Sequence, residues 1–309
     1  MGWTEEEMGD LGGKTVVVTG ANSGLGYAAT KKLARHGAEV VMACRSSEKS
    51  REALKSIKRD IPDPEVILME LDLADLDSVR SFAGEFRRRY DSLDVLCNNA
   101  GVMALPRRET EDGFEMQLGV NHLGHFALTA HLMDLIIDSG GRVVNQSSMA
   151  HENGEMDFND LMMEEEYSKW GAYSRSKLAN LLFTYELDRR LKEIGSEACS
   201  VACHPGVSDT DLFRKGPRME GSKIKLLLGS VLTGIFGQSP DRGCLPMLYA
   251  ATSADIDGGE YIGPDGFKSM RGYPEKQESS EASHDGKDAR KLWERSEELT
   301  GVEFMIDEK

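Results

Sequence analysis

The sequence predicts an α/β protein with a single doubly wound domain and a largely parallel sheet. Runs of β-branched and aliphatic residues, such as Thr15 to Thr19, alternate along the chain with stretches of helical periodicity. This order is typical of parallel sheets covered by helices. The first run leads straight into a glycine-rich turn and a helix. A length of 309 residues is sufficient for one large core, and no repeat of 20 to 50 residues is present.

The glycine-rich turn reads Gly20-Ala-Asn-Ser-Gly24-Leu-Gly26 and is followed by a helix over residues 25–36. A strand, a glycine turn and a helix in this order bring backbone amides and a helix N-terminus to a pyrophosphate. The spacing G-x-x-x-G-x-G differs from the G-x-G-x-x-G fingerprint. Its place between a strand and a helix nevertheless predicts a dinucleotide site on a Rossmann-type domain.

The second strand, over residues 39–43, ends at Cys44-Arg45-Ser46. A site for NAD usually offers a carboxylate here to hold the ribose 2′-hydroxyl, and this sequence has none. A guanidinium and a hydroxyl instead suit a 2′-phosphate. We therefore predict NADP(H) over NAD(H). The alternative is that Arg45 is an ordinary surface arginine at a strand end.

Three further strands are expected to end in polar or small residues. The strand over residues 66–73 brings Asp72 either to an adenine edge or to the N-cap of a helix over residues 75–90. The strand from Leu93 leads into Asn98-Asn99-Ala100-Gly101, where small residues let a ligand approach the backbone. A long helix over residues 114–138 contains Asn121, and the strand after it delivers Ser147 and Ser148.

Tyr173 and Lys177 are four residues apart in a predicted helix over residues 172–191, so their side chains share one face. A nearby ammonium favours the phenolate and lowers the pKa of a tyrosine, which makes the phenol a usable acid and base. Taken alone, the pair also fits a solvated helix surface.

The rest of the chain contains a sixth strand, over residues 198–203, and then Pro205-Gly206-Val207 and Thr210. The apolar segment 212–236 is expected to form a substrate lid, within about 207–240, or alternatively a subunit surface. The acidic segment 151–167 is expected to be a surface loop with little order.

A helix over residues 241–251 leads to the last expected strand, which contains Tyr261 and Ile262. We place the domain boundary at residue 273. Residues 274–288 are expected to be a disordered polar linker, and a C-terminal helix follows over residues 289–299.

Composition excludes several classes of function. The net charge of -16 disfavours nucleic acid and anionic membrane surfaces as partners. The longest apolar stretch is too short for a membrane span, and the N-terminal sequence lacks secretory signal features, so we expect a cytoplasmic protein. The five cysteines are scattered and expected to be buried thiols. Cys199, Cys203 and His204 lack a second ligand pair, so no metal site is predicted.

Taken together, the glycine turn, Asn98-Asn99-Ala100-Gly101, Asn121, Ser148 and Tyr173-x-x-x-Lys177 resemble the short-chain dehydrogenase/reductase family over residues 12–262. Shorter motifs, among them Val120-Asn-His-Leu-Gly-His-Phe, are similar to the branch that holds retinol dehydrogenases and light-dependent protochlorophyllide reductases.

The resemblance implies a role for each motif residue. Tyr173 would be the acid and base, Lys177 would lower its pKa and bind the nicotinamide ribose, Ser148 would bond the carbonyl, and Asn121 would hold a relay water. The expected cofactor contacts are Gly20, Ser23, Gly24, Leu25 and Gly26 at the pyrophosphate, Arg45 and Ser46 at the 2′-phosphate, Asp72 and Leu73 at adenine, and Asn99, Ala100, Gly101, Tyr173, Lys177, Pro205, Gly206, Val207 and Thr210 around the nicotinamide half. A homodimer or homotetramer is a further expectation from the family.

We therefore expect an oxidoreductase that interconverts a carbonyl and an alcohol on an apolar small molecule. A retinoid substrate is not required, because the acidic loop and the lid are this chain's own. One alternative is a non-catalytic regulatory protein that binds NADPH. A second alternative is an epimerase or dehydratase of the family's extended branch, which the glycine spacing disfavours.

Overall fold

The computed structural model describes residues 2–45, 47–207, 238–304 and 306. One eight-stranded sheet runs through this part of the chain in the order β3-β2-β1-β4-β5-β6-β7-β8. The first seven strands in that order are parallel, and β8 is antiparallel to β7. The strands are β1 (Thr15–Thr19), β2 (Glu39–Cys44), β3 (Val66–Glu70), β4 (Val95–Asn98), β5 (Arg142–Gln146), β6 (Cys199–Cys203), β7 (Tyr261–Pro264) and β8 (Pro274–Gln277). The predicted α/β class with a largely parallel sheet is confirmed.

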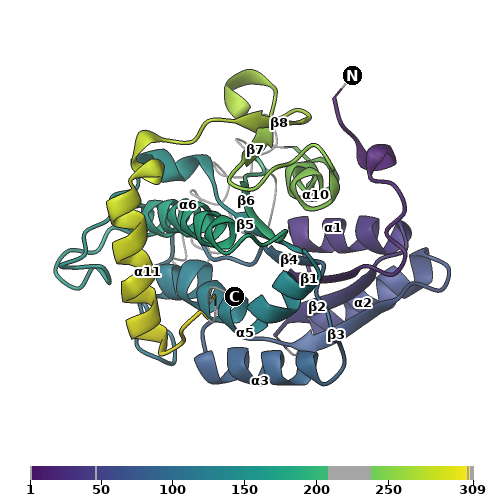
Figure 1. Cartoon of the computed structure of the whole chain (residues 1–309), viewed down its shortest axis with the longest axis horizontal. Coiled ribbons are helices and arrows are strands. Elements are labelled where there is room, and N and C mark those ends of the chain that lie inside the picture. Colours follow the sequence, from purple (N-terminus) through teal and green to yellow (C-terminus); the bar gives the residue numbers. More distant parts are fainter. Residues whose placement is uncertain (1, 46, 208–237, 305, 307–309) are drawn as a thin grey trace, which may run out of the picture.

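Helices cover both faces of the sheet (Figure 1). One face packs against α1 (Gly24–Arg35), α2 (Glu48–Asp60) and α10 (Leu245–Thr252). The other packs against α3 (Leu76–Arg87), α5 (Gly124–Asp138) and α6 (Lys169–Glu193), with α11 (Gly286–Thr300) outside α6. The short α9 (Pro240–Gly243) precedes α10.

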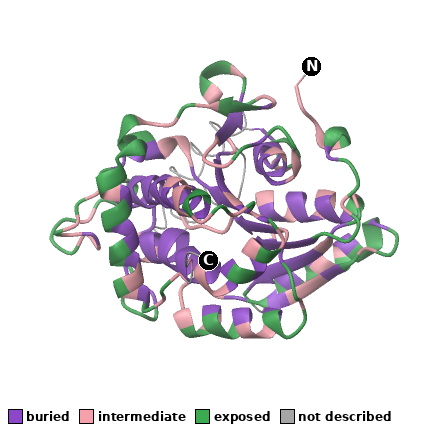
Figure 2. Ribbon diagram, in the orientation of Figure 1, coloured by how far each residue is buried: buried purple, intermediate pink, exposed green. Residues whose placement is uncertain are grey.

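The strands are buried on both sides because side chains alternate between the two helical layers. Val16 and Val18 of β1 belong to the core on the α1 side, and Val17 belongs to the core on the α5 side. All three are almost completely buried. Figure 2 shows the central strands as mostly buried, whereas the edge strands β3 and β8 are partly exposed. A continuous β-branched run is therefore the sequence expected of such a strand.

The strand order reverses between β1 and β4. β1 pairs with β2 on one side and with β4 on the other, and the chain crosses from β3 to β4 between them. At such a switch point the loops that follow the two strands diverge and leave a crevice at the carboxyl ends of the strands.

The polar segment 274–288 is not the disordered linker that we predicted. Its first residues form β8, with Tyr261 opposite Gln277, and a 3₁₀ turn over Glu281–His284 follows. The sequence suggested disorder because few of these residues are apolar, but the segment is held by hydrogen bonds to distant residues, including Tyr185 Oη with Ser279 Oγ at 2.6 Å. The predicted C-terminal helix is confirmed as α11, and its Trp293 is buried.

The acidic segment 151–167 is also better ordered than predicted. The buried Arg175 of α6 donates to the carbonyls of Glu155, Asp160 and Leu161 at 2.6 to 3.0 Å. Leu161 is buried against α6. A guanidinium has enough donors to satisfy several turn carbonyls at once, so one distant side chain fixes the loop.

Several predicted helices differ in detail. The helix expected over residues 114–138 consists of α4 (Met116–Leu118), a π-helical turn over Gly119–Leu123 and α5. The helix expected over residues 241–251 is divided into α9 and α10. The predicted lid lies mostly outside the described residues.

Candidate active site

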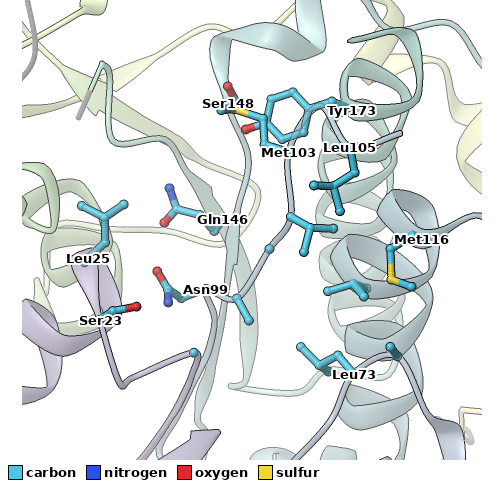
Figure 3. Close-up of a pocket in the computed structure, with 18 of the residues that line it drawn as sticks. Ser23, Leu25, Leu73, Asn99, Met103, Leu105, Met116, Gln146, Ser148 and Tyr173 are labelled. Carbon is cyan, nitrogen blue, oxygen red and sulfur yellow. The ribbon is translucent and has the colours of Figure 1, made fainter. Parts of the chain in front are cut away.

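A cavity of about 580 Å³ lies at the switch point of the sheet (Figure 3). Most of the residues that the sequence singled out line it. These are Gly20, Ser23, Gly24, Leu25, Gly26, Arg45, Asp72, Leu73, Asn99, Ala100, Gly101, Ser148, Tyr173, Lys177, Pro205 and Gly206. Asn121 and Val207 do not line it, and Ser46 and Thr210 lie outside the described residues.

The glycine turn packs closely against the loop after β4. Gly20 has φ +67°, and a Cβ there would lie 3.1 Å from Ala100 Cα. A Cβ on Gly26 would lie 2.6 Å from both the Gly20 carbonyl oxygen and Asn99 Nδ2. Asn99 Nδ2 in turn donates to the Thr19 carbonyl at 2.7 Å. Only glycine allows the two backbones to approach this closely. A glycine turn at the start of a helix can then bind a pyrophosphate through its backbone amides.

Thr19 connects β1 to the loop after β4 through its hydroxyl, and His125 of α5 contacts the same hydroxyl. Thr19 Oγ1 accepts the backbone N–H groups of Asn99 and Ala100, both at 2.9 Å. His125 Nε2 lies 2.9 Å from the same hydroxyl, and His125 Nδ1 lies 3.1 Å from the Asn121 carbonyl. The hydroxyl already accepts two N–H groups, so Nε2 is the acceptor and Nδ1 carries the hydrogen. Burial lowers the pKa of His125 to about 4, consistent with this neutral tautomer.

Arg45 is exposed at the end of β2, beside the start of α2. Its carbonyl accepts Ser50 Oγ at 2.9 Å, and Asn22 Nδ2 of the glycine turn donates to Ser50 Oγ at 2.9 Å. Cys44 is buried, and burial raises the pKa of its thiol to about 11. Of the described residues that directly follow β2, Arg45 therefore offers a cation and Ser47 a hydroxyl, and neither is a carboxylate.

Asp72 is not the N-cap of α3, which was one of the two readings of the sequence. Its carboxylate accepts the Ala74 amide at 3.0 Å, and the N-cap is Asp75, which accepts the amides of Asp77 and Ser78. Asp72 and Leu73 both line the cavity, and Leu73 lies on the same side of it as Met116 (Figure 3).

Tyr173 and Ser148 meet at the opposite end of the cavity (Figure 3). Tyr173 is buried, and its phenol lies beside the Ser148 side chain (Figure 3). Ser148 Oγ also accepts the Ala150 amide at 3.2 Å, because Ser148 caps the turn after β5. Ser147, by contrast, donates to the Lys177 carbonyl at 2.8 Å. Ser148 is therefore the serine that faces the phenol.

Lys177 lies one turn beyond Tyr173 on α6 and is also buried. Its Nζ donates to the Gln146 carbonyl at 2.8 Å and lies 5.8 Å from the centroid of the Tyr173 ring. Burial lowers the pKa of Lys177 to about 8.

The pKa of Tyr173 departs from the sequence prediction. Burial raises the pKa of Tyr173, and the neighbouring Ser148 hydroxyl opposes that rise. We had expected the ammonium of Lys177 to lower it. In this structure the ammonium is directed to a backbone carbonyl, and the phenol is desolvated, which disfavours the phenolate.

Asn121 lies in the π-helical turn between α4 and α5, and its side chain bridges two elements of the site. Its Oδ1 accepts the Val102 amide at 2.8 Å, and its Nδ2 donates to the Val102 carbonyl and to Ser176 Oγ, both at 2.9 Å. Asn121 thus connects the loop after β4 to α6 at Ser176, the residue before Lys177.

Sequence reasoning missed the apolar wall of the cavity, which includes Met103, Leu105, Met116 and Trp170. Trp170 is 51% exposed, and its ring meets that of Tyr173 edge-on at 6.2 Å between centroids. Its position three residues before Tyr173 on a helix is a signal that would have placed it there. Met103 and Leu105 lie in an irregular loop, whose periodicity carries no such signal.

About two thirds of the chain matches the model of a known protein family. A family model described as short chain dehydrogenase matches residues 14–221. The chain belongs to the short-chain dehydrogenase family. The resemblance drawn from the motifs is therefore confirmed, and membership implies a nicotinamide cofactor and a small-molecule substrate.

Individual relatives indicate which members of the family this short-chain dehydrogenase resembles. Retinol dehydrogenase 14 of Homo sapiens is 41% identical over 95% of this chain and 88% of its own length. The crystal structure of an uncharacterized protein from Mycobacterium paratuberculosis has a TM-score of 0.81 at 41% identity, covering 98% of this chain and 99% of that one. The protein is an oxidoreductase related to the retinol dehydrogenases.

A more distant structure contains a nucleotide. It is described as an NAD(P)-dependent gluconate 5-dehydrogenase from Beutenbergia cavernae with bound NADP, with a TM-score of 0.63 at 25% identity over 82% of this chain and 95% of that one. In the described part of the present chain, no helix is sufficiently long and apolar to span a bilayer. The same residues contain no cluster of metal-ligating side chains.

Proposed function

We propose that this short-chain dehydrogenase interconverts a carbonyl and an alcohol on an apolar small molecule, with NADP(H) preferred over NAD(H). The observation that carries the proposal is the juxtaposition of Tyr173 and Ser148 in the wall of the cavity, with the Lys177 ammonium 5.8 Å from the centroid of the Tyr173 ring. A phenol, a hydroxyl and a cation at one end of a dinucleotide-sized crevice are the groups that a carbonyl oxygen needs as it gains charge.

The residues present fit a nicotinamide dinucleotide. Gly20 and Gly26 allow the glycine turn to pack against the loop after β4, because a Cβ at either position would meet Ala100, Asn99 or the turn's own backbone, and the cavity lining includes both Arg45 and Tyr173. We assign the pyrophosphate to residues 20–26, adenine to Asp72 and Leu73, and the nicotinamide half to Asn99–Gly101 together with Pro205 and Gly206. When bound, the nicotinamide supplies or accepts the hydride.

The side chains of this chain handle the proton. Tyr173 donates its phenolic proton to the substrate oxygen during carbonyl reduction and removes it during alcohol oxidation. Ser148 Oγ already accepts the Ala150 amide, so its own hydrogen is available to an oxygen atom beside the phenol. Lys177 keeps a positive charge near the phenol and favours the phenolate when the proton leaves. Asn121 fixes the positions of Val102 and Ser176 beside Lys177 through its two hydrogen bonds.

The preference for NADP(H) rests on the end of β2. Arg45 provides a charge that can pair with a 2′-phosphate, and the Asn22, Ser47 and Ser50 side chains form a hydrogen-bonded polar rim beside it. A carboxylate, which would repel that phosphate and bind a free 2′-hydroxyl, is not present among the described residues there.

The apolar substrate class rests on the wall opposite the glycine turn. Met103, Leu105 and Trp170 surround the approach to Tyr173, and such side chains bind hydrocarbon by excluding water. A relative that is named a retinol dehydrogenase is consistent with an extended apolar substrate.

The function is tested by screening the purified protein with aldehydes, ketones and alcohols of increasing apolar size, with NADPH or NADH and their oxidised forms. Nicotinamide absorbance reports turnover. We expect turnover that is fastest with NADPH and an apolar aldehyde or ketone. Binding of NADPH without turnover of any carbonyl in the panel would favour the regulatory alternative instead.

A further inference from the structure

Two buried histidines connect the catalytic loops to the C-terminal arm, which we define as residues 274–284. His151 lies in the turn that Ser148 begins, and His204 directly follows β6 and precedes Pro205 and Gly206. Both imidazoles are almost fully buried. Neither histidine lines the cavity, so neither belongs to the machinery described above.

The hydrogen bonds of His151 define its tautomer. The backbone N–H of Ser280 donates to His151 Nε2 at 3.0 Å, so Nε2 carries no hydrogen. Nδ1 therefore carries it and donates to the Ser148 carbonyl at 2.7 Å. The arm thus reaches the main chain of Ser148 through one neutral imidazole.

His204 forms a similar bridge, but its two ring nitrogens exchange the roles of donor and acceptor. The Gly206 N–H donates to His204 Nδ1 at 3.2 Å, which leaves the hydrogen on Nε2. His204 Nε2 donates to Gln277 Oε1 of β8 at 2.9 Å. Gln277 Nε2 in turn donates to the Pro264 carbonyl at 2.9 Å. The loop assigned to the nicotinamide half is thereby tied to the last strand of the sheet.

Tyr261 of β7 completes the arrangement. Its ring lies between the two imidazoles, edge-on to His151 at 5.5 Å and stacked on His204 at 5.2 Å between centroids. Burial lowers the pKa of both histidines. All three rings are packed, so a shift of the arm is transmitted to both loops.

We propose that the C-terminal arm holds the Ser148 turn and the Pro205–Gly206 loop in their working positions, with His151 and His204 as positioning residues. The inference rests on the proposed function, because it concerns the geometry around Tyr173. Misplacing a hydrogen-bonding group by a fraction of an ångström lowers a chemical rate without abolishing ligand binding.

The most direct test breaks the bridge at the backbone of Ser280. Ser280 has φ −61°, a backbone conformation that proline adopts. Ser280→Pro deletes the N–H that His151 accepts and places the proline ring Cδ where that hydrogen was, so the His151 imidazole loses its donor and must move away from the arm. Ser280→Ala is the matched control, because it keeps the N–H and removes only a hydroxyl that has no partner among the described residues.

For Ser280→Pro we expect kcat for carbonyl reduction to fall about tenfold while the Kd of NADPH stays close to that of Ser280→Ala. The thermal unfolding midpoint should be lower than that of Ser280→Ala, because a buried nitrogen loses its donor. Ser280→Ala is expected to match the wild-type protein. Equal kcat in the proline and alanine variants would overturn the inference. Wild-type protein without turnover would instead contradict the proposed function, so the two failures are distinguishable.

The second bridge gives an independent measurement that leaves the backbone unchanged. Gln277→Leu removes the acceptor of His204 Nε2–H, and we expect the KM for NADPH to rise about tenfold, because Gly206 borders the nicotinamide half. An unchanged KM for NADPH in a variant that unfolds at a lower temperature would show that Gln277 serves stability only and would overturn this part of the inference.

Discussion

Lys177 Nζ donates to the backbone carbonyl of Gln146 at 2.8 Å. Ser147, the residue directly after β5, donates a hydrogen bond from its hydroxyl to the Lys177 carbonyl, also at 2.8 Å. The end of β5 and the middle of α6 are thus joined by two reciprocal bonds. They hold the ammonium at the cavity wall, one turn from Tyr173, in a buried setting that disfavours charge.

The first prediction concerns the alkaline side of the pH profile. Burial lowers the pKa of Lys177 to about 8, so the lysine is charged below that pH and neutral above it. If the charge supports Tyr173, kcat/KM for carbonyl reduction falls as the pH rises through about 8, because kcat/KM reports groups of the free enzyme. The measurement is kcat/KM from pH 6 to 10 under subsaturating substrate. A profile that stays flat to pH 10 would show that this charge is not needed.

The second prediction concerns the choice of cofactor. Arg45→Glu replaces a cation by a carboxylate at the end of β2, so the variant should bind NADPH about 10- to 100-fold more weakly, as expected for the loss of a charge-assisted contact. NADH binding should be unchanged or improved. Fluorescence titration of both nucleotides gives the ratio. Arg59→Glu, at the far end of α2, is the control for net charge. Equal effects of the two variants on NADPH would count against an Arg45 contact.

The third prediction concerns substrate size. Trp170→Ala removes the half-exposed indole beside Tyr173, and the KM of long apolar substrates should rise about tenfold or more because apolar contact area is lost. The KM of a short aldehyde should change little. Trp170→Phe keeps an aromatic ring and should retain most of the difference. The role of Trp170 in substrate binding is refuted if the alanine variant affects short and long substrates alike.

The fourth prediction concerns stability in acid. Burial lowers the pKa of His122 to about 3 and of His125 and His204 to about 4, against 6.5 in an unfolded chain. Between pH 6.5 and 4 the unfolded state therefore binds more protons, so the free energy of unfolding falls as the pH is lowered. Each histidine contributes at most about 1.4 kcal/mol per pH unit in this window.

Urea unfolding at pH 7, 6 and 5 measures this slope. The effect should precede acid denaturation through carboxylates such as Glu186, whose lowered pKa lies below 4.5 and which acts only at lower pH. His122→Leu removes one of the three proton-binding groups and should make the slope shallower. An unfolding free energy that is constant from pH 7 to 5 would show that the histidines are accessible to protons in the folded protein.

The sequence was sufficient for those features that depend on local pattern. The strands, the glycine turn and the Tyr173 and Lys177 pair follow from periodicity and spacing. The cavity brings together sixteen residues that the sequence pattern and the family resemblance singled out. The C-terminal arm did not follow, because its order depends on partners far along the chain. Ser280 is 129 residues from His151, and Gln277 is 73 residues from His204.

The segment 151–167 illustrates the same difficulty. Its composition is that of a solvated loop, but Arg175 satisfies three of its carbonyls from α6. Burial of that arginine cannot be read from its neighbours in sequence. The pKa of Tyr173 was likewise mispredicted, because spacing indicates the nearby lysine but not the loss of solvent around the phenol.

The most direct test of the account is turnover by Tyr173→Phe, which removes one oxygen from the site. The proposed mechanism predicts a loss of at least about 1,000-fold in kcat with NADPH and an active aldehyde, because the variant lacks the phenol that is assigned to give its proton to the substrate oxygen. NADPH should still bind with a Kd within a few-fold of the wild-type value. A variant that binds NADPH and reduces the aldehyde at the wild-type rate would contradict the assignment of Tyr173 as the acid.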